Sequence, residues 1–545
     1  MREWWRDAVI YQIYPRSFQD DSGDGIGDLK GIIRRLDHVA SLGVDAIWLS
    51  PFFTSPDLDM GYDVSDYKGV SPLFGDINDF DALVEKAHDL GLKVIIDQVL
   101  SHTSDQHPWF QESRQNRTND KADWYVWADP KKDGTPPNNW LSIFGGSGWQ
   151  FDTRRHQYYL HNFLTEQPDL NFHNPAVVDA LLDAMKFWLE RGVDGFRLDT
   201  VNFYVHDADL TDNPPSDWEV FPNNPYEAQD QEFSKSRPEN LEILKRLRDL
   251  TDQYPDRMMV GECGEMGDKQ VRIMGEYTSG GDKLHMAYSF AMLSPEHTAE
   301  HFRHTIEVFQ ETAPDGWPCW SFSNHDVARH VSRWTPKGAD PEAVARQSIA
   351  MLCSFPGTLN IYQGEEIGQT QTDILWEELQ DTANAQFWPE YKGRDGCRTP
   401  MVWEKDAPQG GFSTSDKPWL PVKAPQLARA VDTQEDDTNS ILNAYRRTLA
   451  FRKSRHELRY GKTEFLDLPE PLLGVIRSEE DSAITGIFNL SNEPQRVVLK
   501  KELRPVGPMV GSVEGPVPGK SGKSDDCVVD LPPFGFVYLD GKAEI

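Results

Sequence analysis

A regular alternation of short apolar runs with helical patterns constrains the fold of this 545-residue chain more than any other feature. Eight runs have the length and the flanking turn residues of buried strands, and they cover residues 8–14, 44–49, 93–97, 193–198, 257–261, 283–289, 319–322 and 357–362. Helical spacing follows the runs, most clearly over residues 29–42, 80–90, 175–191, 239–253 and 443–453. Eight strands that alternate with helices predict an α/β fold, a (β/α)8 TIM barrel.

Two long polar stretches and a change of periodicity divide the chain further. Residues 101–169 are polar and aromatic and are too long for a connecting loop, so we expect an inserted subdomain after the third strand. Residues 367–420 form a second, loop-rich insertion. After about residue 460 apolar residues recur at every second position between Pro and Gly turns, which predicts a C-terminal antiparallel β-sandwich. The expected domains are a barrel of residues 1–100 and 170–460, a subdomain of residues 101–169 and a β domain of residues 461–545.

The charge balance and the cysteines limit the partner and the compartment. The formal net charge is −33, which argues against nucleic acid or an anionic membrane as a partner because phosphate binding needs a basic surface. Five scattered cysteines include no CxxC pair, so we expect neither a disulfide framework nor a zinc cluster. The N-terminus lacks the apolar core of a signal peptide, and no apolar run approaches bilayer length. We therefore expect a cytoplasmic protein.

Acidic residues follow the ends of several predicted strands, where the reacting groups of such barrels lie: Asp97, Asp199, Glu262 and Asp326. Arg197 precedes Asp199 by two positions, so in an extended segment both side chains point to the same side. A nearby guanidinium favours the ionised carboxylate that a nucleophile needs. Cleavage of a glycosidic bond requires a nucleophilic carboxylate and a second carboxyl that acts as an acid. The alternative is that these strand ends are polar for structural reasons alone.

The motifs around these residues resemble those of glycoside hydrolase family 13, the α-amylase superfamily, and within it the α-glucosidases of the oligo-1,6-glucosidase-like branch. The matching segments are residues 97–102 (DQVLSH), 167–171 (QPDLN), 195–202 (GFRLDTVN), 260–262 (VGE) and 322–326 (FSNHD). Ser101 departs from the pattern, since many members have Asn there. Each motif alone is weakly specific, but five in order at strand ends are strongly specific. The resemblance covers nearly the whole chain.

The resemblance implies roles for the residues at the strand ends. Asp199 corresponds to the nucleophile and Glu262 to the general acid/base, with Glu265 as the nearest rival for that second role. Asp326 corresponds to the residue that braces the glucose hydroxyls and stabilises the transition state. Arg197 is expected to orient Asp199. Two histidines are expected to hydrogen-bond the sugar hydroxyls, His102 and His325.

Further residues are implied to bind the terminal glucose. Tyr62 corresponds to a stacking platform and Asp63 to an acceptor for the sugar hydroxyls. Arg398 matches an arginine that pairs with that aspartate and closes the pocket, although Arg394 competes for the role. Ordinary core packing of the tyrosine and a surface ion pair are the alternatives. Thr200 follows the nucleophile, and in this family Thr there accompanies α-1,4 cleavage whereas Val accompanies α-1,6 cleavage.

A loop near the N-terminus carries oxygen ligands at alternating positions, as in the front half of an EF-hand. Its predicted metal ligands are Asp20, Ser22, Asp24, the Ile26 carbonyl and Asp28. The bidentate Glu of a complete EF-hand is missing, because Gly31 occupies position twelve. We expect one structural divalent cation of modest affinity, calcium or magnesium, and no organic cofactor. The alternative is a turn rich in Gly and Asp that binds no metal.

The resemblance predicts a retaining exo-acting α-glucosidase that hydrolyses α-1,4-linked glucose from maltose and short α-glucosides, with some transglucosylation. The two insertions should wall the barrel mouth, so that only a chain end can enter. An oligo-1,6-glucosidase, or a transglycosidase such as trehalose synthase or sucrose isomerase, is the alternative. A catalytically silent relative, such as the ectodomain partner of an amino-acid transporter, would need a membrane anchor and lost carboxylates. We expect small-molecule α-glucosides as partners and a monomer or homodimer.

Overall fold

The computed structural model of the protein describes residues 3–515, 518–519, 522–523 and 526–545. Its centre is a parallel eight-stranded sheet in the order β11-β10-β9-β5-β2-β1-β13-β12. In chain order these strands are β1 (Val9–Ile13), β2 (Ala46–Leu49), β5 (Lys93–Gln98), β9 (Gly195–Leu198), β10 (Met258–Cys263), β11 (Met286–Ser289), β12 (Cys319–Ser321) and β13 (Thr358–Tyr362). A parallel bridge between Ala287 and Pro318 joins the two ends of this order, so the sheet is nearly closed. The predicted barrel is confirmed.

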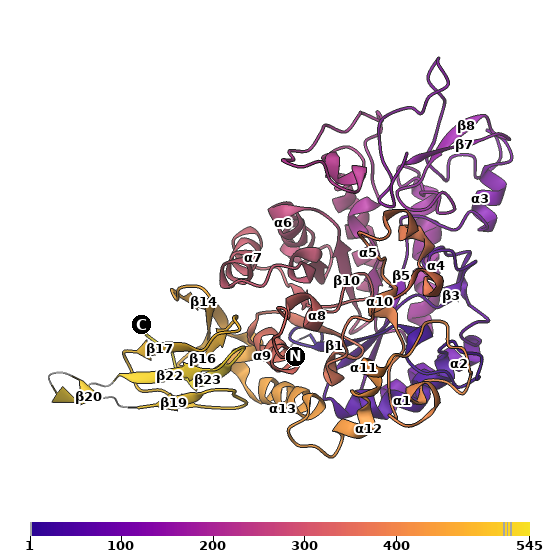
Figure 1. Ribbon diagram of the computed structural model, residues 1–545. Coiled ribbons are helices and arrows are strands. Elements are labelled where there is room, and N and C mark those ends of the chain that lie inside the picture. Colours follow the sequence, from indigo (N-terminus) through magenta and orange to yellow (C-terminus); the bar gives the residue numbers. More distant parts are fainter. Residues whose placement is uncertain (1–2, 516–517, 520–521, 524–525) are drawn as a thin grey trace.

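Helices surround the barrel strands (Figure 1). The longer ones are α1 (Leu29–Ser41), α2 (Ile77–Asp89), α4 (Pro175–Glu190), α5 (Asn240–Thr251), α6 (Gly267–Thr278), α7 (Ala299–Thr312), α9 (Pro341–Ser354) and α13 (Ile441–Ser454). Short helices lie mostly in the connecting segments: α8 (His330–Trp334), α10 (Asp395–Arg398), α11 (Ala424–Leu427), α12 (Val431–Gln434) and α14 (His456–Tyr460). Caps fix several starts; Asn174, for example, accepts a hydrogen bond from the Ala176 N–H just before α4.

The interior of the barrel is filled by side chains at every second strand position, as the period of a strand requires. One buried cluster includes Ile10, Trp48, Ile95, Val260 and Met286, from five different strands. The same inward face continues toward the carboxyl ends of the strands. On β5 the residue two positions beyond Ile95 is Asp97, and on β10 the residue two positions beyond Val260 is Glu262. The strand period thus places apolar side chains deep in the barrel and acidic side chains at its mouth.

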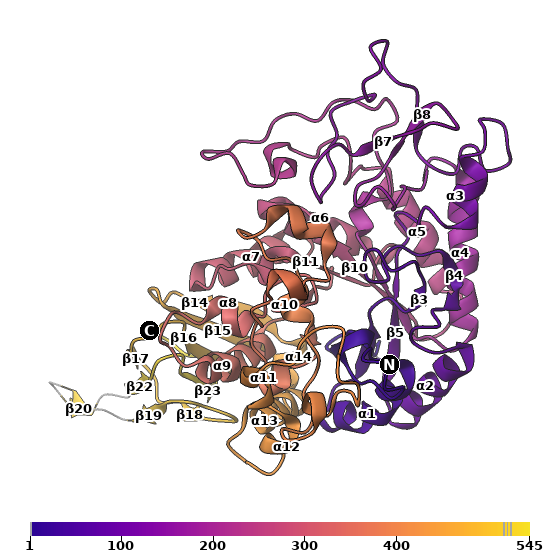
Figure 2. The same cartoon turned by 45° about the vertical axis from the view of Figure 1, so that its right-hand side comes forward.

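The segment between β5 and α4 carries small elements of its own, α3 (Pro108–Ser113), β6 (Trp127–Ala128), β7 (Trp149–Asp152) and β8 (Gln157–Leu160). Its three strands form an antiparallel sheet in the order β6-β8-β7, which lies beyond the carboxyl ends of the barrel strands (Figure 2). A second segment, residues 207–235, packs against it: the Asn138 side-chain amide donates to the Leu210 carbonyl (3.0 Å), and Asn139 donates to the Asn213 carbonyl (2.8 Å). A short hairpin of β3 (Phe53–Thr54) and β4 (Asp66–Val70) follows β2.

The C-terminal part forms antiparallel sheets, which confirms the predicted β domain. The first has the order β14-β15-β16-β23-β18 and the second β17-β22-β19. Their bounds are β14 (Lys462–Leu466), β15 (Leu472–Glu479), β16 (Ser482–Asn489), β17 (Gln495–Leu499), β18 (Arg504–Pro505), β19 (Ser512–Glu514), β22 (Cys527–Leu531) and β23 (Phe536–Asp540), with β20 (Pro518–Gly519) and β21 (Gly522–Lys523) as a separate pair. Side chains of both sheets share one core, such as Ile487 and Val529.

The β domain is attached to the barrel through buried polar contacts. The Gln347 side chain on α9 donates to the Asn489 carbonyl at the end of β16 (2.6 Å). The guanidinium of Arg477 on β15 is buried and donates to the Ser354 carbonyl at 3.0 Å. Within the part of the chain that the structure describes, no helix has the length and apolar character of a membrane span.

Candidate active site

Five buried side chains meet at the carboxyl end of the barrel. Asp97 on β5 lies beside Arg197 on β9, and Glu262 on β10 lies beside Tyr288 on β11. Asp199 follows Arg197 by two positions and lies just beyond the end of β9. All five side chains are buried, with exposed fractions of 5% or less. The sequence analysis places three of these carboxylates at one mouth, and the structure brings them together around the same guanidinium.

Arg197 contacts three carboxylates at once. Its Nη1 lies 2.8 Å from Asp97 and 2.5 Å from Asp199 Oδ1, and its Nη2 lies 2.7 Å from Glu262 Oε1. Burial opposes the charge of this arginine, but the facing carboxylates raise its pKa above the usual value. The guanidinium is therefore a permanent cation. It holds Oδ1 of Asp199, while Oδ2 receives a weaker hydrogen bond from the Thr200 hydroxyl at 3.2 Å.

The two carboxyls nearest the pocket hold their protons unusually tightly. Burial raises the pKa of both Asp199 and Glu262 to about 7, and Arg197 opposes this shift in each case. The two groups also repel each other, so they titrate as a pair and the first proton leaves more easily than the second. A pair that keeps one proton near neutral pH contains one anion and one acid. This is the combination that acid-assisted nucleophilic substitution needs.

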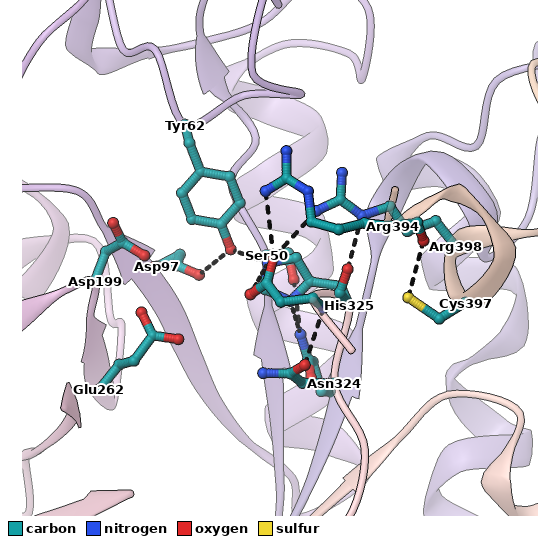
Figure 3. A network of polar contacts seen from close by, with 12 residues as sticks. Ser50, Tyr62, Asp97, Asp199, Glu262, Asn324, His325, Arg394, Cys397 and Arg398 are labelled. Carbon is teal, nitrogen blue, oxygen red and sulfur yellow. Dashed lines mark hydrogen bonds and ion pairs between the residues drawn. The ribbon is translucent and has the colours of Figure 1, made fainter. Parts of the chain in front are cut away.

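Arg394 and Arg398 lie on the opposite side of the site from Asp199 and Glu262 (Figure 3), and they give Asp326 a more basic environment. Its carboxylate is 3.1 Å from Arg398 and 3.4 Å from Arg394. Burial would raise its pKa, but the basic groups around it, with His325 foremost, lower the pKa to about 2. Asp326 is therefore a fixed anion, unlike the pair that faces it.

Tyr62 and His325 form the wall between these two groups of charges. Their rings stack at 5.3 Å, and the Tyr62 hydroxyl lies 2.5 Å from His325 Nε2 and 3.2 Å from Asp97. Gln12 contacts the other ring nitrogen of His325 at 2.8 Å. Burial lowers the pKa of His325 to about 3, so the ring stays neutral at neutral pH. Both residues are held in fixed orientations, and Tyr62 lines the pocket.

The expected pair of Asp63 with Arg398 is not the one that the structure forms. Asp63 is fully buried below the loop and accepts hydrogen bonds from the Ser55 hydroxyl and from the Leu58 and Asp59 N–H groups. Arg398 instead donates to the His325 carbonyl at 2.7 Å and contacts Asp326. The pairing prediction is wrong because Asp63 is needed to fold its own turn.

The rival arginine makes the contact across the pocket. Arg394 lies 2.8 Å from Asp59, and it donates to both oxygens of Asp381 at 2.9 Å. Asp59 and Arg394 line the pocket, whereas Asp63 and Arg398 do not belong to its lining. The sequence analysis considered Arg394 only as a competitor and missed Asp59. The segment 59–63 contains two aspartates, and only the turn geometry shows which one faces the pocket.

His102 and Thr200 lie beyond the ends of β5 and β9, and both contact the Ser101 hydroxyl. Burial lowers the pKa of His102 to about 4, and its ring nitrogens contact Ser101 Oγ (2.9 Å) and the Tyr62 carbonyl (3.1 Å). Thr200 has a φ of +40°, which is strained for a β-branched residue. Its hydroxyl lies 3.1 Å from Ser101 Oγ, and its N–H donates to Glu262 Oε2 at 3.2 Å. Both predicted residues line the pocket.

Glu265, the rival of Glu262, is engaged elsewhere. Its carboxylate forms ion pairs with Lys235 (3.5 Å) and Lys269 (3.2 Å) and accepts a hydrogen bond from the Ser236 hydroxyl. It does not line the catalytic pocket, whereas Glu262 does. The geometry therefore favours Glu262 as the second carboxyl of the site.

The pocket has a volume of about 220 Å³, below the usual range for drug-sized ligands. Three parts of the chain enclose it. The barrel supplies the carboxylates, the inserted segment supplies Ile143, Phe144 and Phe163, and the loop after β13 supplies Asn384, Tyr391 and Arg394. A pocket of this size that is walled on several sides fits one sugar ring.

The loop of the predicted metal ligands is closed by its own hydrogen bonds. Asp20 accepts from the N–H groups of Gly23 (2.7 Å) and Gly25 (2.8 Å), and from the hydroxyls of Ser22 (3.0 Å) and Ser413. Asp28 caps α1, and Asp24 accepts from the Ile26 N–H at 2.9 Å. Among the described residues, no three His, Cys, Asp or Glu side chains are grouped to hold a metal. These hydrogen bonds hold the loop in its turn conformation, and a bound divalent ion stays a prediction.

Comparison with known proteins agrees with the geometry. Residues 12–461 match the family model described as the α-amylase catalytic domain. The chain is 57% identical, over 90% of its length and 90% of the relative's, to a probable α-glucosidase of Rhizobium meliloti (strain 1021). It is 36% identical, over 87% of each chain, to an oligo-1,6-glucosidase of Parageobacillus thermoglucosidasius. The crystal structure of an α-glucosyl transfer enzyme superposes with a TM-score of 0.94 at 50% identity, covering 99% of this chain and 100% of that one. The chain belongs to the α-amylase family of glycoside hydrolases.

Proposed function

We propose that the protein is a retaining exo-acting α-glucosidase that releases terminal α-1,4-linked glucose from maltose and short α-glucosides. The observation that carries the proposal is the pair of Asp199 and Glu262 at the base of a one-ring pocket. One oxygen of Asp199 is bound by Arg197, and within the part of the chain that the structure describes the other is bound only by Thr200. The α-glucosidase relatives support the same activity.

In the first step, Oδ2 of Asp199 forms a bond with the anomeric carbon of the bound glucose. The bond from that carbon to the glycosidic oxygen breaks, and Glu262 gives its proton to the leaving oxygen. In the second step, ionised Glu262 takes a proton from a water molecule. The water oxygen attacks the anomeric carbon, Asp199 leaves as a carboxylate, and Glu262 is protonated again. Atoms and charges balance over the two steps.

Asp326 and the Asp59–Arg394 pair are proposed to bind the hydroxyls of the same glucose. Asp326 remains ionised and can accept hydrogen bonds from two hydroxyls, which strengthen as charge develops on the ring. Arg394 can donate to a hydroxyl while it stays paired with Asp59 and Asp381. A sugar with a further residue on its non-reducing side would have to displace this pair. The pocket is therefore proposed to accept only a chain end.

Transfer to a second sugar is the other candidate outcome of the second step. Its support is the 50% identity to the α-glucosyl transfer enzyme. The same covalent intermediate would form, and a sugar hydroxyl would replace water as the attacking group. The ratio of the two outcomes depends on the acceptor side of the pocket, where Phe203, Phe290 and Tyr391 provide apolar and aromatic surface.

The experiment that tests the proposal is a comparison of initial rates on maltose, isomaltose, sucrose and trehalose, with the products separated by chromatography. Maltose is expected to give the highest kcat/KM, with glucose as the main product. Rearranged disaccharides as the main product would favour transfer instead. The Asp199→Asn variant is the matched control, since an amide cannot form the intermediate. Hydrolysis by that variant at the wild-type rate would overturn the assignment of the nucleophile.

Two further expectations remain proposals. A cytoplasmic location is supported by five buried cysteines, none of which forms a disulfide. A structural calcium or magnesium ion in the loop of residues 20–28 is supported by the regular spacing of oxygen ligands.

A further inference from the structure

Tyr288, a residue that neither the family motifs nor the pocket lining singles out, contacts two of the central groups of the site. It lies on β11 directly beside Glu262 on β10, and only 4% of it is exposed. Its hydroxyl oxygen is 2.9 Å from Glu262 Oε1. The same oxygen is 3.1 Å from Nε and 2.8 Å from Nη2 of Arg197. One phenol therefore joins the guanidinium to the carboxyl.

The direction of each hydrogen bond follows from the chemistry of the partners. A guanidinium can only donate, so the Tyr288 oxygen accepts both N–H groups of Arg197. The hydroxyl has a single hydrogen, which is then left for Glu262 Oε1. Burial raises the pKa of Tyr288 well above its usual value, so this hydrogen remains in place across the working range of pH. The arrangement admits no second assignment in which Tyr288 accepts from Glu262.

The contacts also distinguish the two oxygens of Glu262. Oε1 accepts the Tyr288 hydroxyl and lies 2.7 Å from Nη2 of Arg197, so two donors already face it. Among the described residues, only the Thr200 N–H donates to Oε2, at 3.2 Å. A proton on Oε1 would point at two donors, and a proton on Oε2 would not. The carboxyl proton is therefore carried by Oε2.

We propose that Tyr288 is a positioning residue that fixes Glu262 in the orientation in which Oε2 exchanges the proton with the glycosidic oxygen. The proposal rests on the acid/base function proposed above for Glu262 and deepens it. Tyr288 touches neither the sugar nor the reacting atoms, and it acts through Glu262 and Arg197. Its hydroxyl stabilises the ionised form of Glu262, the form that must take a proton from water in the second step.

The direction in which loss of the Tyr288 hydroxyl shifts the pKa of Glu262 can be derived. A donor to a carboxylate favours its charged form, so Tyr288→Phe raises the pKa of Glu262. The other charged or titratable groups that face Glu262 stay in place: Arg197, Asp199, Asp97 and Asp326. A hydrogen bond to a charged group corresponds to a shift of about one pH unit. The basic limb of the kcat/KM profile, which reports deprotonation of the acid, is expected to move up by about that amount.

A second expected effect depends on the leaving group. Maltose needs a proton on its leaving oxygen, so kcat for maltose is expected to fall about tenfold in Tyr288→Phe. An aryl α-glucoside with a good leaving group needs little protonation, and its kcat should change less than twofold. A purely structural tyrosine would lower both rates together and leave the pH limb in place.

Tyr204→Phe is the matched control. Tyr204 is also buried, at 1% exposed, and its hydroxyl has no hydrogen-bond partner among the described residues. The substitution removes the same atom from the neighbourhood of Asp199, and it should leave both the basic limb and the leaving-group dependence unchanged. If Tyr204→Phe shifts the limb as far as Tyr288→Phe does, the effect is general and the proposal fails.

The experiment measures pH profiles of kcat/KM with maltose and with the aryl glucoside for wild type, Tyr288→Phe and Tyr204→Phe. An unshifted basic limb in a folded Tyr288→Phe protein, or equal losses on both substrates, would overturn the proposal. If Tyr288→Phe does not fold, 3-fluorotyrosine at position 288 replaces it, since its more acidic hydroxyl should move the limb down. An unshifted basic limb in the 3-fluorotyrosine protein would also contradict the proposal. If Glu262 is not the acid/base, the Glu262→Gln variant would lose activity equally with maltose and with the aryl glucoside, which distinguishes that failure from failure of the Tyr288 proposal.

Discussion

Replacement of Arg394 by Lys tests which arginine holds the terminal glucose. The guanidinium of Arg394 is one-tenth exposed and spans three carboxylates, with contacts of 2.8 Å to Asp59, 2.9 Å to Asp381 and 3.4 Å to Asp326. An ammonium keeps the charge but cannot reproduce the bidentate contact with Asp381 and still reach Asp59. At least one buried carboxylate would lose its partner. Each such loss costs about 1–3 kcal/mol, and more for a charged group.

The expected loss of free energy is large enough to show whether it affects KM or kcat. A loss of about 3 kcal/mol corresponds to about a hundredfold in an equilibrium constant. Arg394 and Asp59 line the pocket away from Asp199 and Glu262, so the loss should appear mainly in KM for maltose. Arg398→Lys is the matched comparison. Its guanidinium contacts the His325 carbonyl and Asp326 but not Asp59, so its loss should appear mainly in kcat.

The assay is steady-state kinetics on maltose for both variants, with melting temperatures to confirm that each is folded. An Arg394→Lys enzyme with wild-type KM beside an Arg398→Lys enzyme with a greatly raised KM would refute this reasoning. That result would restore Arg398 as the arginine that closes the pocket.

Three more outcomes are expected. Glu262→Gln should lose much more activity with maltose than with activated aryl glucosides, and a selective loss in Glu265→Gln instead would reverse the assignment. Thr200→Val should shift the kcat/KM ratio from maltose toward isomaltose by one or two decades, since one unpaired polar group costs about 1–3 kcal/mol; a wild-type preference for isomaltose would contradict this. If the loop of residues 20–28 binds a divalent ion, calcium or magnesium should raise the melting temperature of metal-free protein, and coincident melting curves would count against the site.

The barrel could be predicted because its signal is local and repeated. Each strand is a short apolar run, as in the residues of β5 and β13, and the helices between them have a clear amphipathic period. The positions of Asp97, Asp199 and Glu262 followed from the same signal, since a residue at a strand end needs only the strand to be placed. The sequence was therefore sufficient to predict these three carboxylates at the centre of the site.

The site residues on long loops could not be predicted from the sequence. Asp59 and Arg394 lie on different loops, and no periodicity fixes the path of either one. The family resemblance pointed to Asp63 instead, which the structure uses to close a turn through the Leu58 N–H. Tyr288 was missed although its position was predictable. It lies in a predicted strand, two positions after Met286, and the strand period alone would have pointed it into the barrel beside Glu262.

The site separates its charges into two groups with opposite proton behaviour. In the first group one guanidinium serves three buried carboxylates, Asp97, Asp199 and Glu262. One cation cannot neutralise three anions, so burial prevails and the pKa values rise to between about 6 and 7. In the second group His325, Arg394 and Arg398 face Asp326, and they lower the pKa of that carboxyl to about 2. The balance of basic groups to carboxylates thus separates the acids that are proposed to exchange protons during the reaction from the fixed anion that is proposed to bind the sugar.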